Sequence, residues 1–273
     1  MKLNDSVRKD ISIALTVWKE LLNEFLPDGI EYIFTKGSSS KPWETDIDYV
    51  PLISDVDIHI KLYNNKKKLL STTNGFNQAV FFTTNYEKWF STECKRINHK
   101  KIHLPRVQIV QIESHGRKGY VVPPRNKDII WIQGSFPFPE EMDHNKLRDM
   151  DKKSLLQEKP FIDSIPDIFF EQSGFDYYTL LYRLCSRMSP CPIRLLTQVL
   201  PDNPHDIWAL NKSSIFKLLQ KNGFTTIAEN FEQFYLNGWR LFESSFMDMN
   251  VFRMMIKNGY FLLTSCYEEL LKL

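Results

Sequence analysis

The stretch that decides the fold runs from Gly37 to Ile60 and reads GSSSKPWETDIDYVPLISDVDIHI. Residues 30–36 (IEYIFTK), just before it, are rich in β-branched and aromatic types, which predicts a strand that ends at the polar Gly-Ser turn. Residues 55–62 (DVDIHIKL) alternate polar and apolar side chains with a period of two, which predicts a second strand. Asp55 and Asp57 then lie on the polar face of that strand, opposite its apolar residues.

Two carboxylates at positions i and i+2 of a strand lie close together on one face, and they repel each other there. The arrangement becomes favourable when a divalent cation sits between the two acids, and Mg²⁺ prefers oxygen ligands of this kind. A Gly-Ser turn beside them exposes backbone N–H groups and a hydroxyl, and glycine lets a phosphate approach the backbone closely. Gly37, Ser38, Asp55 and Asp57 therefore predict a site for a metal-bound nucleotide.

This order of features, an apolar strand, Gly-Ser, a spacer and an Asp-x-Asp flanked by apolar residues, resembles the nucleotidyltransferase superfamily of DNA polymerase beta-like enzymes. The resemblance covers about residues 30–62 at motif level and extends more weakly to about residue 133. It implies transfer of a nucleoside monophosphate from an NTP such as ATP to an acceptor hydroxyl, with Mg²⁺ or Mn²⁺ as cofactor. It also implies that Asp55 and Asp57 are catalytic metal ligands and that Gly37-Ser38 holds the β and γ phosphates.

The family carries a third carboxylate on a later strand. Residues 107–113 (VQIVQIE) form the best candidate strand, and Glu113 is its only acidic residue, so either Glu113 completes the triad or the third ligand is missing. Sixteen residues separate Ser38 from Asp55, somewhat more than is usual in the family, and they include a second Asp-x-Asp, Asp46-Ile47-Asp48. We favour Asp55 and Asp57 because their strand is longer, but the sequence leaves both pairs open.

Further polar residues flank the motif. Lys36, Lys61 and Arg106 are candidates for phosphate contacts, although each is equally compatible with a solvated strand end or surface charge. His59 lies on the carboxylate face of the second predicted strand, where it either contacts substrate or metal or is a satisfied structural residue.

Charge is distributed unevenly along the chain although the net charge is only +2. Residues 1–60 carry a net −5, residues 61–127 carry +11, residues 128–176 carry −6 and residues 177–273 carry +2. A basic block of this kind favours ligands with phosphates, so we expect an NTP as substrate and an RNA acceptor bound through residues 61–127. Solvated surface charge explains the asymmetry equally well, and related enzymes also modify small molecules or proteins.

The rest of the sequence predicts an α+β fold. An N-terminal nucleotidyltransferase-like domain, residues 1–140, combines a small mixed β-sheet with flanking helices at 6–26 and 76–97, and further strands are predicted at 107–113, 119–122 and 128–133. The stretch 134–176 is acidic and holds four prolines, which predicts a connector at residues 141–174 with at most one short helix at 143–157. Residues 175–273 carry apolar stripes at helical spacing and predict an α-helical domain.

Several classes of function are excluded or disfavoured. Neither a membrane span nor a secretion leader is predicted, so we expect a soluble cytoplasmic protein. The four cysteines include no C-x-x-C pair with zinc-site spacing, and Cys94 with His99 and His103 makes a poor catalytic pair. Neither a Walker-type P-loop nor a G-x-G-x-x-G is present. The main alternative to an enzyme is a nucleotide- or RNA-binding protein that keeps the fold without the activity.

Overall fold

The computed structural model describes residues 3–26, 29–63, 69–70, 73–112, 125–135, 141–171 and 175–273. They form an α+β protein with one small mixed sheet and many helices, as the sequence predicts. The chain divides into two compact units. The first contains Met1–Lys41 and Ser54–Glu140, and the second contains Pro42–Ile53 and Glu141–Leu273.

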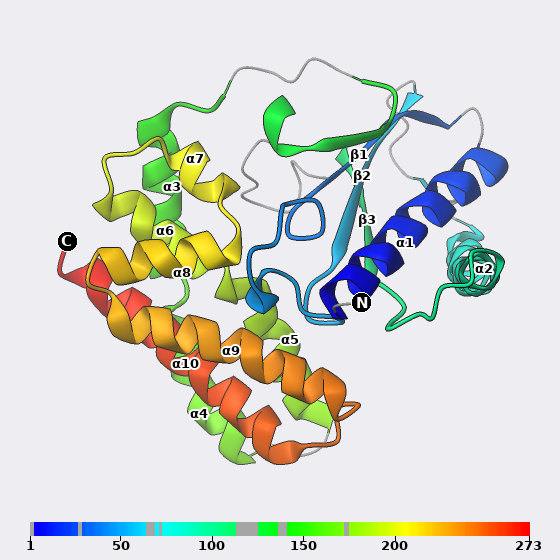
Figure 1. The fold of residues 1–273 in the computed structure, drawn as a ribbon. Helices are drawn as coiled ribbons and strands as arrows, with labels where there is room; N and C mark the ends of the chain where they lie inside the picture. Colours follow the sequence, from blue (N-terminus) through cyan, green and yellow to red (C-terminus); the bar gives the residue numbers. More distant parts are fainter. Residues whose placement is uncertain are drawn as a thin grey trace. The chain divides into compact units, whose positions relative to one another are not determined.

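The first unit is built on a four-stranded sheet (Figure 1). Its strands are β1 (Ile30–Lys36), β2 (Val56–Leu62), β3 (Val107–Gln111) and β4 (Ile130–Gln133), in the order β3-β2-β1-β4. β1 is antiparallel to both of its neighbours, whereas β2 and β3 are parallel. The strand predicted at 119–122 lies outside the described residues.

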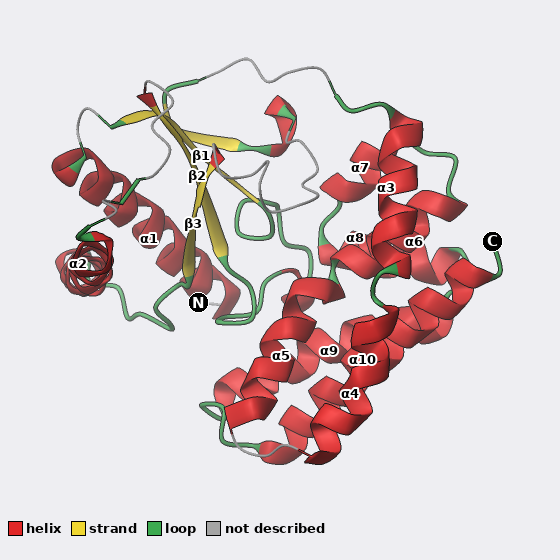
Figure 2. Ribbon diagram, turned by 180° about the vertical axis from the view of Figure 1, so that it is seen from behind, coloured by secondary structure: helices red, strands yellow, loops and turns green. Residues whose placement is uncertain are grey.

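Two helices, α1 (Leu3–Phe25) and α2 (Gly75–Arg96), lie together on one side of this sheet (Figures 1 and 2). α2 supplies the crossover that a parallel β2–β3 pair requires. Aromatic side chains join the two helices, with Trp18 and Tyr86 at a ring-centroid distance of 5.3 Å and Phe25 edge-on to Phe81 at 4.7 Å. Such pairs add to the stabilisation that comes from buried apolar area.

The two faces of the sheet differ in character. Ile33, Ile58 and Ile60 occupy one face and are at most 1% exposed. On the other face the ring of His59 stacks on Phe34 at 4.8 Å with an interplanar angle of 6°. His59 is 3% exposed. The strand period of two therefore separates an aliphatic core face from an aromatic layer, and His59 belongs to that layer.

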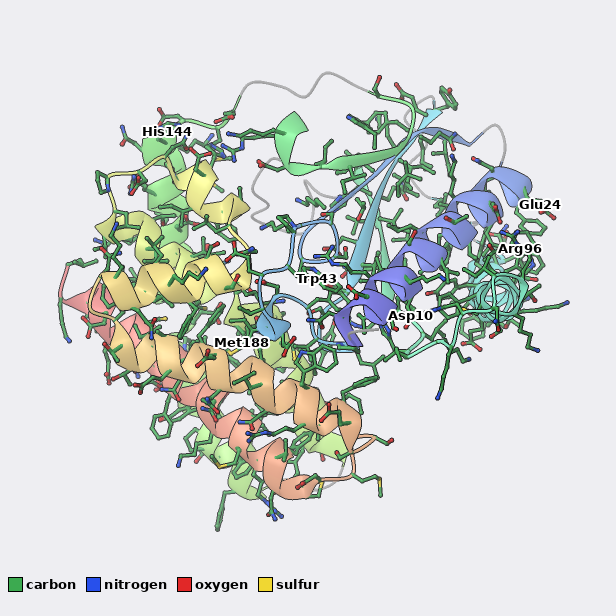
Figure 3. The ribbon with its side chains drawn as sticks, in the orientation of Figure 1. Asp10, Glu24, Trp43, Arg96, His144 and Met188 are labelled. Carbon is green, nitrogen blue, oxygen red and sulfur yellow. The ribbon has the colours of Figure 1, made fainter. Side chains whose placement is uncertain are left out.

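Asp10 on α1, labelled in Figure 3, holds the loop that follows α2. Its carboxylate lies 2.7 Å from the Nε2 atom of His99 and 3.0 Å from Nδ1 of His103, and it accepts the backbone N–H groups of Ile102 and His103. Burial raises the pKa of Asp10, but these hydrogen bonds outweigh it and hold the pKa below its ordinary value. His99 and His103 are thus engaged with Asp10, while burial of the nearby Cys94 raises its thiol pKa.

The second unit is helical (Figure 2). The long helices α9 (Thr225–Glu243) and α10 (Met249–Leu271) pack along each other. Around them lie α3 (His144–Leu156), α4 (Lys159–Glu171), α5 (Phe175–Met188), α6 (Pro190–Val199), α7 (Pro204–Ala209) and α8 (Lys212–Lys221). Phe231, Phe234 and Phe252 are fully buried and form the centre of this unit's core.

Residues 141–174 are predicted as a connector with at most one short helix at 143–157. α3 matches that helix, but α4 is a second helix that the sequence analysis does not predict, and both belong to the second unit. The prediction treated prolines as breaks, but Pro160 stands in the first turn of α4, where a proline costs no hydrogen bond. Pro166 lies inside α4, and the packing of this helix against α5 and α10 overrides its low helix propensity.

The spacer 42–53 also belongs to the second unit. Asp48, which is 1% exposed, lies in the one-turn 3₁₀ helix Asp46–Asp48. Its carboxylate accepts four hydrogen bonds, from the N–H groups of Glu44, Thr45 and Ser213 and from the Ser213 hydroxyl. Asp48 therefore anchors the spacer to α8.

No helix in the described ranges combines the length and the apolar character that crossing a bilayer requires.

Substituting Asp48 with alanine should lower the free energy of unfolding by about 3 kcal/mol, because the donors around its carboxylate lose a charged acceptor in a buried place. Urea denaturation monitored by circular dichroism measures the loss. Asp46→Ala is the matched control, since the Asp46 side chain is exposed, and we expect a change within about 0.5 kcal/mol. Equal losses in the two variants would contradict an anchoring role for Asp48.

Candidate functional site

The site predicted from the sequence lies at one end of the sheet in the first unit. β1 ends at Lys36, which pairs in register with Asp57 near the start of β2. Asp55 directly precedes β2, and Arg106 directly precedes β3. Because β1 is antiparallel to β2 and β3 is parallel to it, the end of β1 and the beginnings of β2 and β3 meet at the same edge.

Gly37 forms the turn beside the carboxylates. Its φ of 94° lies in the left-handed region, and a Cβ atom built on it would lie 3.3 Å from Oδ2 of Asp57. The N–H and hydroxyl groups of Ser40 both donate to the carbonyl of Gly37, at 3.2 Å and 3.0 Å, and so tighten the turn. A side chain at position 37 would therefore strain the backbone and crowd the Asp57 carboxylate.

Asp55 is held by Arg106, whose Nη2 atom donates to Oδ2 of Asp55 at 3.1 Å. The Arg106 and Asp55 side chains are 39% and 30% exposed. An ion pair exposed to this degree contributes only about 0–1 kcal/mol. The ion pair can therefore be broken at little cost when a divalent cation binds Asp55 or a phosphate binds Arg106.

Asp57 has a strongly perturbed carboxyl group. Burial and, second, the neighbouring charge of Asp55 raise its pKa to about 7, against the opposing effect of Lys36 and Arg106. Burial lowers the pKa of Lys36, and the charge of Asp57 opposes that shift. Two carboxylates that resist simultaneous ionisation are typical of a site that binds a cation or transfers a proton.

The donor set fits a divalent cation. Asp55 and Asp57 supply only oxygen ligands, and the repulsion between them is relieved when a positive charge joins them. In the part of this unit that the structure describes, these two carboxylates would hold Mg²⁺ or Mn²⁺, with the Gly37 turn directly beside them.

The other residues that the sequence predicts for the site lie in different places. Ser38 follows Gly37 in the turn and is partly buried. Lys61 lies four residues beyond Asp57 on β2, roughly 13 Å along the strand, and is not brought to the carboxylates. Glu113, proposed as the third ligand, lies outside the described residues.

One neighbour of the carboxylates was not singled out by the sequence analysis. Gln108 on β3 pairs in register with Asp57 and is exposed. No local sequence signal identifies it, because its place beside Asp57 depends on the parallel register of β2 and β3. From Arg106 to Ile112 the chain has no acidic residue, so the described part of β3 brings an amide and not a carboxylate to this position.

The second Asp-x-Asp does not form a comparable pair. Asp46 is exposed and Asp48 is buried with its carboxylate already hydrogen-bonded, and both belong to the second unit. The long spacer of the motif follows from this arrangement, because the chain leaves the first unit after Lys41 and returns at Ser54.

Comparisons of the chain with protein-family models, with curated proteins and with solved structures find no match. The fold and the site together define an α+β protein in which two carboxylates, a lysine and an arginine gather at one end of a mixed sheet, next to a glycine turn.

The raised pKa of Asp57 has a measurable consequence for stability. A carboxyl group with a folded pKa near 7 and an unfolded pKa near 4 stabilises the fold below about pH 4, and this contribution disappears as the pH rises to 7. Asp57→Asn should therefore raise the unfolding temperature by a few °C at pH 8 and leave it nearly unchanged at pH 4.

Thermal unfolding at the two pH values checks this expectation, and carbon-detected NMR of the Asp57 carboxyl gives its pKa directly. Asp55→Asn is the control for the like-charge effect, because removing that charge should lower the pKa of Asp57. An Asp57 that titrates near pH 4 in the wild type would contradict the described environment.

Proposed function

We propose that the protein is a metal-dependent nucleotidyltransferase that moves a nucleoside monophosphate from an NTP to an acceptor hydroxyl. The observation that carries the proposal is the pair Asp55 and Asp57, of which Asp57 has a pKa raised to about 7 by burial and by its neighbour. The Gly37 turn supports the proposal further. A Cβ atom at position 37 would lie 3.3 Å from Asp57, so the lack of a side chain there leaves room for a phosphate beside the metal ligands.

In this mechanism Asp55 and Asp57, both ionised, hold the divalent cations and fix their position at the end of the sheet. When bound, the cations neutralise phosphate oxygens and lower the pKa of the acceptor hydroxyl. The acceptor hydroxyl gives its proton to water, and its oxygen attacks the α-phosphorus in line as the bond to pyrophosphate breaks. The turn at Gly37 and Ser38 would hold the β and γ phosphates through its backbone N–H groups, and Arg106, released from Asp55, would compensate their charge.

The acceptor that the charge distribution favours is RNA. The basic block 61–127 carries a net +11, and among its described residues Lys88, Lys95, Lys100 and Lys101 are exposed. Positive side chains in such number bind a phosphate backbone with an affinity that falls steeply with salt. Acceptors of other classes, small molecules or proteins, do not need this charge.

A second candidate function is binding of a nucleotide or RNA without catalysis. Gln108, beside Asp57 on β3, favours it, because a site of two carboxylates and an amide holds one cation more readily than two. The variant Glu113→Gln separates the two functions: transfer is lost if Glu113 is the third ligand, and nucleotide binding is unchanged if the site is not catalytic.

The test is label transfer from each α-labelled NTP to total RNA in the presence of Mg²⁺ or Mn²⁺. We expect the wild type to label RNA and Asp55→Asn/Asp57→Asn to lose about 100-fold or more of that activity, because its remaining ligands are neutral. Asp46→Asn removes an exposed acid from the other Asp-x-Asp and should retain full activity.

Two other results have defined meanings. Metal-dependent NTP binding without labelling of RNA would overturn the RNA acceptor and direct the search to small-molecule and protein acceptors. No NTP binding by the wild type, measured by equilibrium dialysis with metal present, would contradict the nucleotidyltransferase proposal and leave RNA binding without catalysis as the remaining candidate.

A further inference from the structure

A second group of possible metal ligands lies in the helical unit, apart from the residues of the proposed nucleotidyltransferase site. Glu141, His144 and His205 each offer one ligand atom, and these three atoms lie within 4.8 Å of one another. His144, labelled in Figure 3, is the first residue of α3, and His205 lies in α7, which packs against α3. Glu141 and His144, which are close in the sequence, thus meet the distant His205 at one point of the fold.

His205 is already oriented as a metal ligand. Its ring lies 2.8 Å, through Nε2, from the backbone carbonyl of Met142. A carbonyl only accepts hydrogen bonds, so Nε2 carries the proton and Nδ1 of the neutral ring has the free lone pair. A hydrogen bond from one ring nitrogen to a backbone carbonyl is the usual support for a histidine that binds metal through the other.

The other ring nitrogen of His205, Nδ1, has no hydrogen-bond partner in the part of the chain that the structure describes. The residue is 2% exposed, and its Nδ1 atom is buried without a hydrogen-bond partner among the described residues. A buried polar atom in this state is costly unless something binds it. Glu141 and His144, the other two members of the group, are exposed.

The geometry suits a small cation. Ligand atoms around tetrahedral Zn²⁺ are separated by about 3.4 Å, given metal–ligand distances near 2.1 Å. The observed spread of up to 4.8 Å closes with small rotations of the exposed Glu141 and His144 side chains. The partial positive charge at the start of α3 opposes a cation only weakly, and the carboxylates of Glu141 and Asp143 outweigh it.

We propose that Glu141, His144 and His205 form a zinc site with two histidines, one glutamate and an open fourth position. Imidazole and carboxylate ligands together favour Zn²⁺ over Mg²⁺, which prefers oxygen alone. The ion links Glu141 and His144, at the start of α3, to His205 in α7, and so connects two parts of the helical unit. The site is independent of the proposed transferase activity, because it shares none of that activity's residues.

Isothermal titration with Zn²⁺, together with the visible absorption of Co²⁺ as a probe of tetrahedral coordination, tests this site on the full chain after treatment with a chelator. We expect one Zn²⁺ per chain, and an affinity at least tenfold lower in both His144→Ala and Glu141→Gln. Both positions are exposed, so these variants should fold. Asp149→Asn, an exposed acid on the same helix, should bind Zn²⁺ as the wild type does.

The Asp55→Asn/Asp57→Asn variant distinguishes this site from the carboxylate pair, and it should retain the Co²⁺ absorption. Zn²⁺ should also raise the unfolding temperature of the wild type by a few °C, and much less in His144→Ala. The proposal is overturned if the wild type binds no Zn²⁺ stoichiometrically, if His144→Ala and Glu141→Gln bind as tightly as the wild type, or if binding disappears in Asp55→Asn/Asp57→Asn.

Discussion

The arrangement of charges in the first unit depends on the electrostatic repulsion between the carboxylates of Asp55 and Asp57. Two carboxylates at one strand end are unfavourable in isolation, and burial of Asp57 increases the cost. The fold compensates for them with positive charges from two other segments, Lys36 opposite Asp57 and Arg106 on Asp55. The compensation is incomplete, since the pKa of Asp57 stays near 7, and the remaining electrostatic cost is what a divalent cation would remove.

The topology explains how these charges come together. An antiparallel β1–β2 pair and a parallel β2–β3 pair bring one strand end and two strand beginnings to the same edge. The chain between β1 and β2 passes through the second unit, where Asp48 anchors it through Ser213. Two Asp-x-Asp sequences nine residues apart therefore have opposite roles: one leaves its carboxylates at the sheet edge, and the other buries a carboxylate as a structural acceptor.

Much of this was predictable from local patterns. The β-branched run 30–36 predicts the bounds of β1, and the alternation in residues 55–62 predicts those of β2 to within one residue. The alternation is a clear signal because one face of the strand is fully buried. The helix α3 was predicted, but α4 was not, since tertiary packing overrides the prolines that indicate a break there. Glu141-x-x-His144 is a visible local signal, but its completion by His205 depends on the packing of α7 against α3. The residue beside Asp57 was equally hidden, because it requires the β2–β3 register.

The most direct test of the central claim is the position of Mn²⁺ in crystals grown with Mn²⁺ and a non-hydrolysable NTP analogue, located by its anomalous scattering. The account predicts manganese bound by the carboxylates of both Asp55 and Asp57, with the analogue's phosphates against the Gly37 turn and Arg106 displaced from Asp55. Manganese absent from these two carboxylates, with the ion pair between Arg106 and Asp55 intact, would contradict it.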